Sequence, residues 1–169
     1  YRELNWGGSA GGDWHTAGNW LEGYVPEAAD DVVIGTGYPV LSNPGLGEDV
    51  VVADGAELHT GAFDLTIVSI DLQGTARLER SGGTNVSAAD TDSGTVAYTG
   101  AGAIQEYGPI DYVDLEIAAG ATIGAGVSIG VAGNLAVVSG GSIVAAGTGS
   151  ISVGTGAALT GDGSISVAD

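Results

Sequence analysis

The chain of 169 residues contains no Cys, no Met and no Lys, and its Lys and Arg total is three: Arg2, Arg77 and Arg80. Recognition of phosphate groups depends on clustered Lys and Arg, so this shortage argues against nucleic acid and against an anionic membrane surface as partners. The sequence also lacks any run of the roughly 18 apolar residues that a membrane-spanning helix needs, so we expect no insertion into a membrane.

Residues that favour helices are scarce, whereas Gly, Val, Ile, Ser and Thr are abundant. The chain has 32 Gly against 4 Pro, and 44% of its residues are hydrophobic, which is enough for a packed core. The glycines follow no three-residue period, which excludes collagen. No segment shows ten residues of helical periodicity. The composition therefore predicts an all-β protein with many short strands and tight turns.

Short apolar segments between turn signals predict the individual strands, and apolar and polar residues alternate at the end of residues 65–72 and over residues 112–117. Turn signals include Asp54-Gly55, Ser81-Gly82-Gly83 and Gly108-Pro109. The expected strands cover residues 31–34, 49–53, 65–72, 75–79, 95–98 and 112–117.

A repeat of six residues then indicates how the strands stack. The apolar residues Ile117, Ile123, Ile129 and Leu135 recur every six positions, and the spacing lengthens to eight afterwards. A strict period of six would indicate a left-handed hexapeptide helix. The drift to eight favours a less regular, single-stack β-solenoid (a β-helix) with ladders of buried Ile, Val and Leu. A β-sandwich or jelly roll is the alternative architecture.

Charge divides the chain into two parts. Residues 1–117 contain 19 of the 21 acids and all three Arg, a net charge of −16, whereas residues 118–169 contain two acids and no base. We expect one continuous domain: a Trp-rich cap over residues 1–30, acidic irregular coils over residues 31–117, and uncharged coils rich in Gly, Ala, Val and Ile over residues 118–169. Free strand edges in an uncharged tract promote aggregation, so we expect these edges to be paired.

All three Trp residues, Trp6, Trp14 and Trp20, fall within the first 20 residues. The end of a solenoid exposes core and unpaired backbone groups, and aromatic rings bury large apolar areas. We therefore predict that these rings fold over the first coil as a cap. The alternative is an exposed platform on which a sugar or another ligand stacks.

The opening segment resembles the start of β-solenoid regions in bacterial surface proteins and autotransporter passengers. The matching features are a Trp (Trp6 or Trp14), Asn19-Trp20, the turn at Pro26, the acidic pair Asp30-Asp31 and the strand Val32-Val33-Ile34. The tract from residue 112 to 153 is similar to the repeating strands of these regions. The resemblance implies a β-solenoid but no single activity, because such modules occur in adhesins, sheaths, filaments and enzymes.

Patterns typical of an enzyme are weak. The chain has no Cys nucleophile, and His15 and His59 lie apart without the spacing of paired metal ligands. Polysaccharide lyases on similar β-helices use Arg or Lys at the sugar carboxylate. Here we expect Arg77 and Arg80 on one solvent face beside acids such as Glu79. The sequence therefore predicts a protein that is not an enzyme.

The turn Asp90-Thr91-Asp92-Ser93-Gly94 is the segment best suited to a metal ion. Carboxylate and carbonyl oxygens are the ligands that Ca²⁺ prefers. A complete EF-hand loop is absent, and Asp-rich turns also form without metal. Asp90 and Asp92 are therefore the candidate Ca²⁺ ligands, and no other cofactor is expected.

Two functions remain. The first is an extracellular structural protein that self-assembles head-to-tail into a filament, a sheath or a surface layer, because such stacking does not close on itself. The second is an adhesin or carbohydrate-binding module of a larger surface protein, with glycans as ligands. Both place a mature or excised segment outside the cell or at its surface. The residues expected at the self-assembly contact are Ile151, Val153, Ile165 and Val167.

Overall fold

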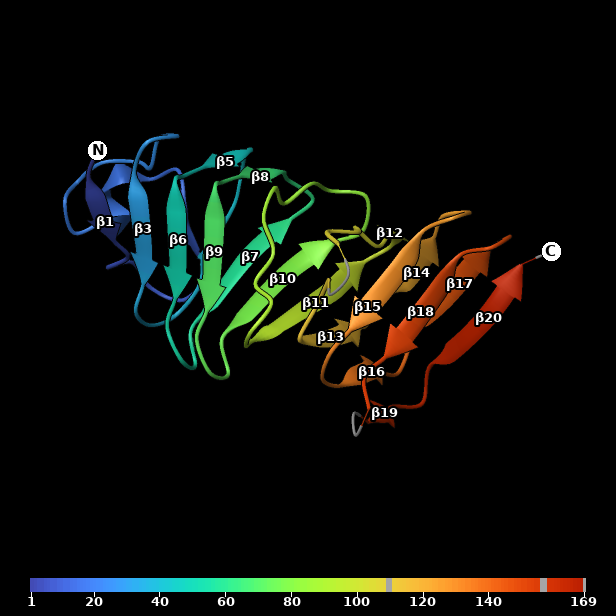
Figure 1. Cartoon of the computed structure of the whole chain (residues 1–169). Helices are drawn as coiled ribbons and strands as arrows, with labels where there is room; N and C mark the ends of the chain where they lie inside the picture. The colour runs from blue at the N-terminus through green and yellow to red at the C-terminus, as the bar shows by residue number, and fades with distance from the viewer. Residues whose placement is uncertain (109–110, 156–157, 169) are drawn as a thin grey trace.

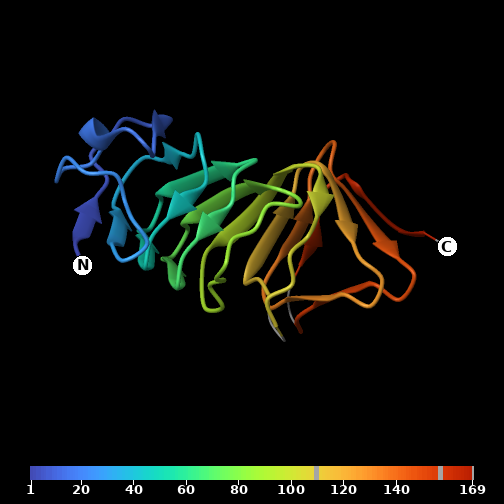
Figure 2. The same cartoon turned by 90° about the horizontal axis from the view of Figure 1, so that it is seen from above.

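The computed structural model describes residues 1–108, 111–155 and 158–168, with backbone only for residues 167 and 168. It is an all-β solenoid of about seven turns, as the sequence predicts. The coils stack from the N-terminal to the C-terminal end, and the two termini lie at opposite ends of the stack (Figure 1 and Figure 2). In the described ranges the only helical segment is a 3₁₀ turn at Ala17–Asn19, and no helix is long and apolar enough to cross a membrane.

One parallel sheet runs along the whole stack and is called here the long sheet. Its strands, in chain order, are β2 (Gly12–Asp13), β4 (Pro39–Val40), β7 (Glu57–Gly61), β10 (Arg77–Ser81), β11 (Thr95–Gly100), β13 (Asp114–Ile117), β16 (Leu135–Val137) and β19 (Leu159–Thr160).

Shorter parallel sheets form the other faces of the coils. Near the N-terminus these are β1 (Glu3–Asn5), β3 (Asp31–Ile34), β6 (Asp49–Val52) and β9 (Ser69–Leu72), with the pair β5 (Gly45–Leu46) and β8 (Leu65–Thr66). Near the C-terminus they are β12 (Gly102–Ala103), β14 (Gly120–Ile123), β17 (Ser142–Ala146) and β20 (Ser164–Ala168), with the pair β15 (Ser128–Val131) and β18 (Ser150–Val153).

The core consists of apolar ladders along the stack. In β3, β6, β7 and β10, buried and half-exposed residues alternate, as the two-residue period of a strand requires. Strand register places Leu58 beside Leu78, and Leu115 beside Leu135. Each fully buried Leu, Ile or Val stabilises the fold by about 1.5–3 kcal/mol relative to an exposed side chain. The repeated ladders therefore hold successive coils in register.

Most predicted strands are present, but one spans a corner. The strand predicted over residues 31–34 is confirmed, and the strand predicted over residues 49–53 is β6. The segment 65–72 forms two strands, β8 and β9, which lie in different sheets. Between them Ile67 is buried and Val68 is exposed. The buried positions are 65 and 67 before the corner and 70 and 72 after it, so the two-residue alternation changes phase where the chain changes face.

The six-residue repeat traces the successive faces of one coil and the first face of the next coil, because β16 pairs with β13. Ile117, Ile123, Ile129 and Leu135 lie in β13, β14, β15 and β16, and all four side chains are buried. In the next coil the faces lengthen, so Ile151 pairs with Ile129 from 22 positions further along the chain. The solenoid is therefore irregular, as the drift in spacing predicts.

Arg80 is the exception to the apolar interior. Its side chain is fully buried, so the expectation that Arg77 and Arg80 share a solvent face is wrong. The two residues are three positions apart on β10, and residues three apart on a strand point to opposite faces. Arg80 donates through Nη1 to the Tyr107 hydroxyl at 2.7 Å, and its guanidinium lies 5.1 Å from the centre of the Tyr98 ring.

Tyrosines surround this guanidinium. The Tyr98 and Tyr112 hydroxyls are 2.8 Å apart, and Tyr112 donates to the carbonyl of Gln105 at 2.5 Å. Burial raises the pKa of Tyr107 and of Tyr112 well above that of an exposed tyrosine. Both hydroxyls therefore remain protonated at neutral pH and can donate hydrogen bonds. This polar core lies between β10 and β13, and the chain forms no strand from residue 82 to residue 94.

Candidate functional site

The three Trp rings form a compact cluster at the N-terminal end of the stack. Trp6 and Trp20 pack edge to face with centroids 5.1 Å apart, and Trp14 and Trp20 do the same at 4.9 Å. Trp20 also donates from Nε1 to the carbonyl of Trp14 at 2.8 Å. The rings are at most 5% exposed, so none presents a face on which a sugar could stack.

The segment that carries Trp20 also covers the outer edge of the first strand. Leu21 donates its backbone N–H to the carbonyl of Asn5 at 2.9 Å, and Glu22 accepts the backbone N–H of Asn5 at 2.8 Å. These bonds occupy the outward-facing backbone groups of Asn5 in β1. The N-terminal end nevertheless presents large apolar side chains to solvent, because Leu21 is 74% exposed and Tyr24 is 55% exposed.

The C-terminal end is open. Strands β18, β19 and β20 each pair on one side only within the described residues. Leu159 is 62% exposed and Ile165 is 45% exposed, although the register continues the inner ladders onto both. Ile151 and Val153 are half-buried against the core. The fourth predicted contact residue, Val167, lies in β20, and its side chain is outside the described residues.

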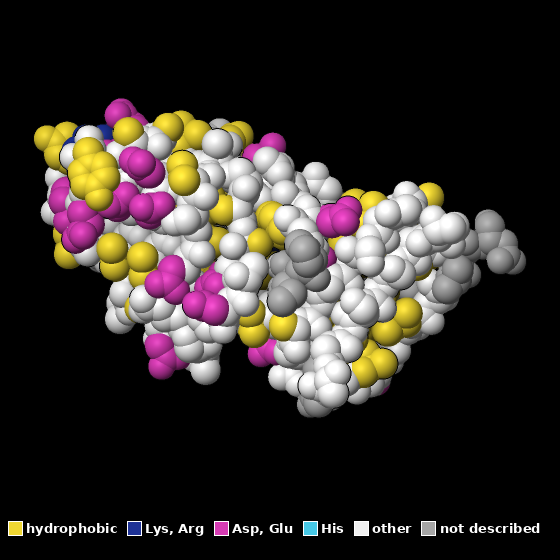
Figure 3. Space-filling model, in the orientation of Figure 1, with side chains coloured by type: hydrophobic (Ala, Val, Ile, Leu, Met, Phe, Trp, Pro, Cys, Tyr) yellow, Lys and Arg dark blue, Asp and Glu magenta, His cyan; other side chains and the backbone are white. Residues whose placement is uncertain are grey.

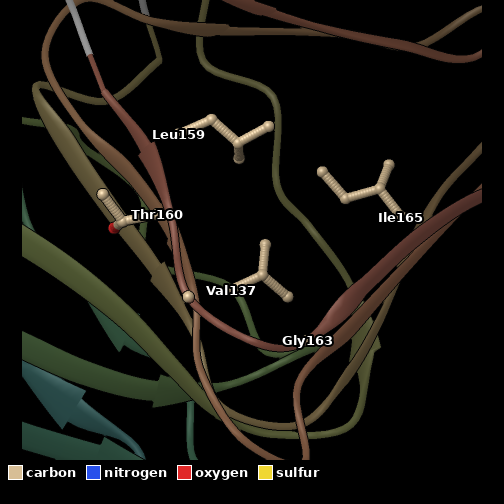
Figure 4. A pocket seen from close by; sticks show the side chains of 6 residues that line it. Val137, Leu159, Thr160, Gly163 and Ile165 are labelled. Carbon is tan, nitrogen blue, oxygen red and sulfur yellow. The ribbon is translucent and has the colours of Figure 1, made fainter.

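A hollow of about 390 Å³ lies at this end. The side chains of Val137, Leu159 and Ile165 converge on it (Figure 4). The remaining lining residues are Thr160, Gly161 and Gly163. The hollow is the uncovered interior of the last coil, so its lining is the same type of surface that neighbouring coils bury elsewhere in the stack.

The predicted calcium turn brings Asp90 and Asp92 together with Asp71, and one carboxylate oxygen of each lies within 4.8 Å of the others. Asp90 is largely buried, and its two oxygens accept the backbone N–H groups of Leu72 and Asp92 at 2.5 Å and 2.9 Å. Burial raises the pKa of Asp90 despite these hydrogen bonds. The carboxylate of Asp90 thus fixes the backbone of the turn. Asp71 is the third carboxylate of the group, and the local motif does not reveal it.

A row of charged side chains, called here the charged row, crosses the outer face of the long sheet. Glu57 and His59 lie on β7, Arg77 and Glu79 on β10, and Glu116 on β13. Register places Glu57 beside Arg77 and His59 beside Glu79. The sequence signal for this row is a period of 20, because Glu57-Leu58-His59 and Arg77-Leu78-Glu79 are equivalent segments of consecutive coils.

Arg77 is paired with acids, as predicted. It makes two hydrogen bonds to Glu116, at 3.0 Å and 2.7 Å, while its Nε lies 3.9 Å from Glu79. These two hydrogen bonds are the main reason why the pKa of Glu116 is lowered. Ala97 lies between Glu79 and Glu116 in the sheet and is fully buried although it belongs to the outward-facing set of β11.

One group contains the residue types of a hydrolase triad, but its geometry differs. Ser42 Oγ donates to Asp13 Oδ1 at 2.7 Å, whereas the distance from Ser42 Oγ to His15 Nδ1 is 3.4 Å. His15 Nε2 contacts the carbonyl of Pro44 at 3.1 Å instead of a nucleophile. In an acyl-transfer triad the imidazole lies between the hydroxyl and the carboxylate. Here the Ser42 hydroxyl contacts the Asp13 carboxylate directly, so the His15 imidazole is not placed to take the hydroxyl proton.

Comparison with known proteins does not assign the chain to a family. No protein-family model, curated protein or solved structure matches the chain.

Proposed function

We propose that this chain is an extracellular structural protein that self-assembles head-to-tail through the two ends of its solenoid. The observation that carries the proposal is the placement of exposed large apolar residues at both ends. Leu159 and Ile165 surround the open last coil, and Leu21 and Tyr24 lie on the N-terminal end. The resemblance of the opening segment to bacterial surface solenoids supports the extracellular location.

Packing of the N-terminal end against the last coil of the next copy would bury both apolar sets. Because the edge of β1 is already occupied at Asn5, we expect side-chain packing at this contact in addition to any strand pairing. A contact between unlike ends repeats along a line and builds a filament. A contact between two C-terminal ends would be symmetric and would stop at a dimer.

The charge distribution also supports this contact. In Figure 3 the Asp and Glu side chains gather over the N-terminal half, and residues 118–169 contain only two acids. An end with few acids approaches an acidic end with less like-charge repulsion than two acidic ends of a molecule at −18 would have. Rising salt should strengthen the contact further because it screens the remaining charge.

The test is assembly of the purified chain at high protein and salt concentration, measured by light scattering and electron microscopy. Ile165→Lys should leave a folded monomer and abolish assembly. The matched control is Val68→Lys, because Val68 is 71% exposed but lies midway along the stack; this variant should assemble like the wild type. Strictly monomeric wild-type protein would refute the proposal.

Leu21→Lys separates the two possible geometries. In head-to-tail assembly the variant should lose its filaments as Ile165→Lys does, because both ends take part in every contact. In tail-to-tail pairing it should still form dimers, and this result would refute the head-to-tail arrangement.

The second candidate is an adhesin or carbohydrate-binding module of a larger surface protein. The observation that favours it is an aromatic ring beside polar groups on the charged row, where Tyr38 stacks on His59 with centroids 4.3 Å apart. Sugar sites combine an aromatic face with convergent polar groups. Binding to a glycan array that is lost in Tyr38→Ala, together with a monomeric state in high salt, would favour this function over assembly.

A further inference from the structure

Three side chains of the charged row converge at one point. His59 Nε2 lies 2.5 Å from Glu57 Oε2, and His59 Nδ1 lies 3.9 Å from Glu79 Oε1. One ligand atom from each residue lies within 4.8 Å of the other two. Two carboxylates and one imidazole are common ligands of divalent transition metals.

This group carries excess negative charge. Arg77 is the only Arg in the charged row, and its two short hydrogen bonds go to Glu116 rather than to Glu57 or Glu79. Glu79 lies 3.9 Å from Arg77 Nε and accepts a hydrogen bond from the Thr99 hydroxyl at 3.3 Å. The single positive charge of Arg77 is therefore shared by Glu116 and Glu79 and cannot balance Glu57 as well, and a divalent cation would supply the missing charge.

The scaffold holds the imidazole in a defined orientation. Tyr38 stacks on the His59 ring at an interplanar angle of 15°, and Val40 flanks His59 on the neighbouring strand β4. Glu57 and His59 alternate on one face of β7, while Glu79 lies opposite His59 on β10. All three ligands thus come from paired strands rather than from loops, which limits the rearrangement that metal binding requires.

We propose that Glu57, His59 and Glu79 form a binding site for a divalent transition-metal ion with the ligand preferences of Zn²⁺. The imidazole nitrogen distinguishes this site from the all-oxygen Asp90/Asp92 turn, which suits Ca²⁺. Ligand atoms bound to Zn²⁺ lie about 2.0–2.2 Å from the ion, so the side-chain tips must close around it.

The chain contains two His and no Cys, so His15 is the single other side chain with a nitrogen or sulfur ligand typical of Zn²⁺. Zn²⁺ is titrated into the purified chain while the two imidazole side chains are observed by NMR at neutral pH. The His59 signals should shift or broaden at a ratio near one metal ion per chain, and the His15 signals should stay in place. Equal changes at both His, or none at millimolar Zn²⁺, would overturn the proposal.

Two variants and one ion serve as controls. Glu79→Gln preserves the size of the side chain and should weaken Zn²⁺ binding by about tenfold or more, in the range found for the loss of a metal-site interaction. His15→Ala should bind Zn²⁺ like the wild type, and Ca²⁺ should leave the His59 signals unchanged. Unaltered affinity in a Glu79→Gln protein with a wild-type circular dichroism spectrum would exclude Glu79 as a ligand and contradict the proposed site.

Discussion

A buried charge with no carboxylate partner among the described residues is the least expected residue-scale feature of this protein. Arg80 is enclosed among Tyr98, Tyr107 and Thr84, and its hydrogen bonds go to neutral oxygens. Removing a guanidinium from water costs free energy, which only well-placed acceptors and an aromatic face offset. Arg80 thus organises a polar core in the irregular middle of the solenoid, while Arg77 on the outer face makes an ordinary ion pair with Glu116.

Arg80→Ala should therefore lower the free energy of unfolding by about 3 kcal/mol or more, because it leaves a cavity and unpaired hydroxyl and carbonyl groups. Arg77→Ala, a change at the partly exposed pair, should cost about 1 kcal/mol or less. Arg80→Met should fall between them, since it fills the space without a charge. Urea denaturation measures all three, and an Arg80→Ala protein as stable as Arg77→Ala would contradict the structural role of Arg80.

Trp20 is the central ring of the N-terminal cluster, because it packs against both Trp6 and Trp14. Trp20→Ala should cost about 3–5 kcal/mol of unfolding free energy, the usual range for a buried aromatic residue, and should promote aggregation. Leu21→Ala is the neighbouring control and should cost little because its side chain is exposed. A loss below about 1 kcal/mol for Trp20→Ala, combined with lost glycan binding, would indicate a ligand platform instead.

At the scale of elements, close approach between coils determines where glycine is needed. A Cβ placed on Gly141 would lie 2.1 Å from the carbonyl oxygen of Ile117 in the coil below, far inside van der Waals contact. This crowding occurs just before β17, whose strand pairs with β14. The abundance of Gly in residues 118–169 therefore partly reflects contact between backbones at the corners of the coils.

Gly141→Ala should destabilise the protein by more than about 1 kcal/mol, because the corner must move away from the preceding coil. Gly35→Ala is the matched control, since a Cβ at Gly35 would meet no atom within 4 Å. Thermal denaturation of both variants checks the prediction. Equal melting temperatures for the two variants would mean that the coil corner adapts without cost.

At the scale of the whole molecule, the dominant features are a net charge of −18 and its uneven distribution. The acids along the N-terminal coils repel one another, and salt screens that repulsion over a Debye length of about 10 Å at 0.1 M. Within the Asp90/Asp92 turn the raised pKa of Asp90 has a further consequence. Ionisation of Asp90 is less favourable in the folded than in the unfolded state. The free energy of unfolding therefore decreases as the pH rises through the pKa of folded Asp90.

The melting temperature should therefore rise with NaCl, by about 2–4 °C for each kcal/mol gained. Millimolar Ca²⁺ should raise it further at matched ionic strength if Asp90 and Asp92 bind the ion. Asp92→Asn, with EDTA-treated wild type as the reference, should remove only the Ca²⁺-specific part. Identical melts in EDTA, high NaCl and Ca²⁺ would refute both the screening argument and the calcium prediction.

The sequence alone was sufficient for features that depend on neighbouring residues. The segment Val32-Val33-Ile34 after a polar turn predicts β3, because β-branched side chains favour strands. The six-residue recurrence from Ile117 to Leu135 predicts buried positions on successive faces of a coil. Composition excludes helices for a similarly local reason, since few segments contain residues that favour them.

Tertiary structure decided what depends on contacts between coils. Residues 65–72 are predicted as one strand, but closure of the coil turns the chain between β8 and β9 and places them in different sheets. Arg80 became a core residue because its neighbours supply acceptors from segments that follow it in the chain. His59 meets Glu79 because coils of 20 residues place them side by side. Such proximity arises from stacking, which local alternation does not encode.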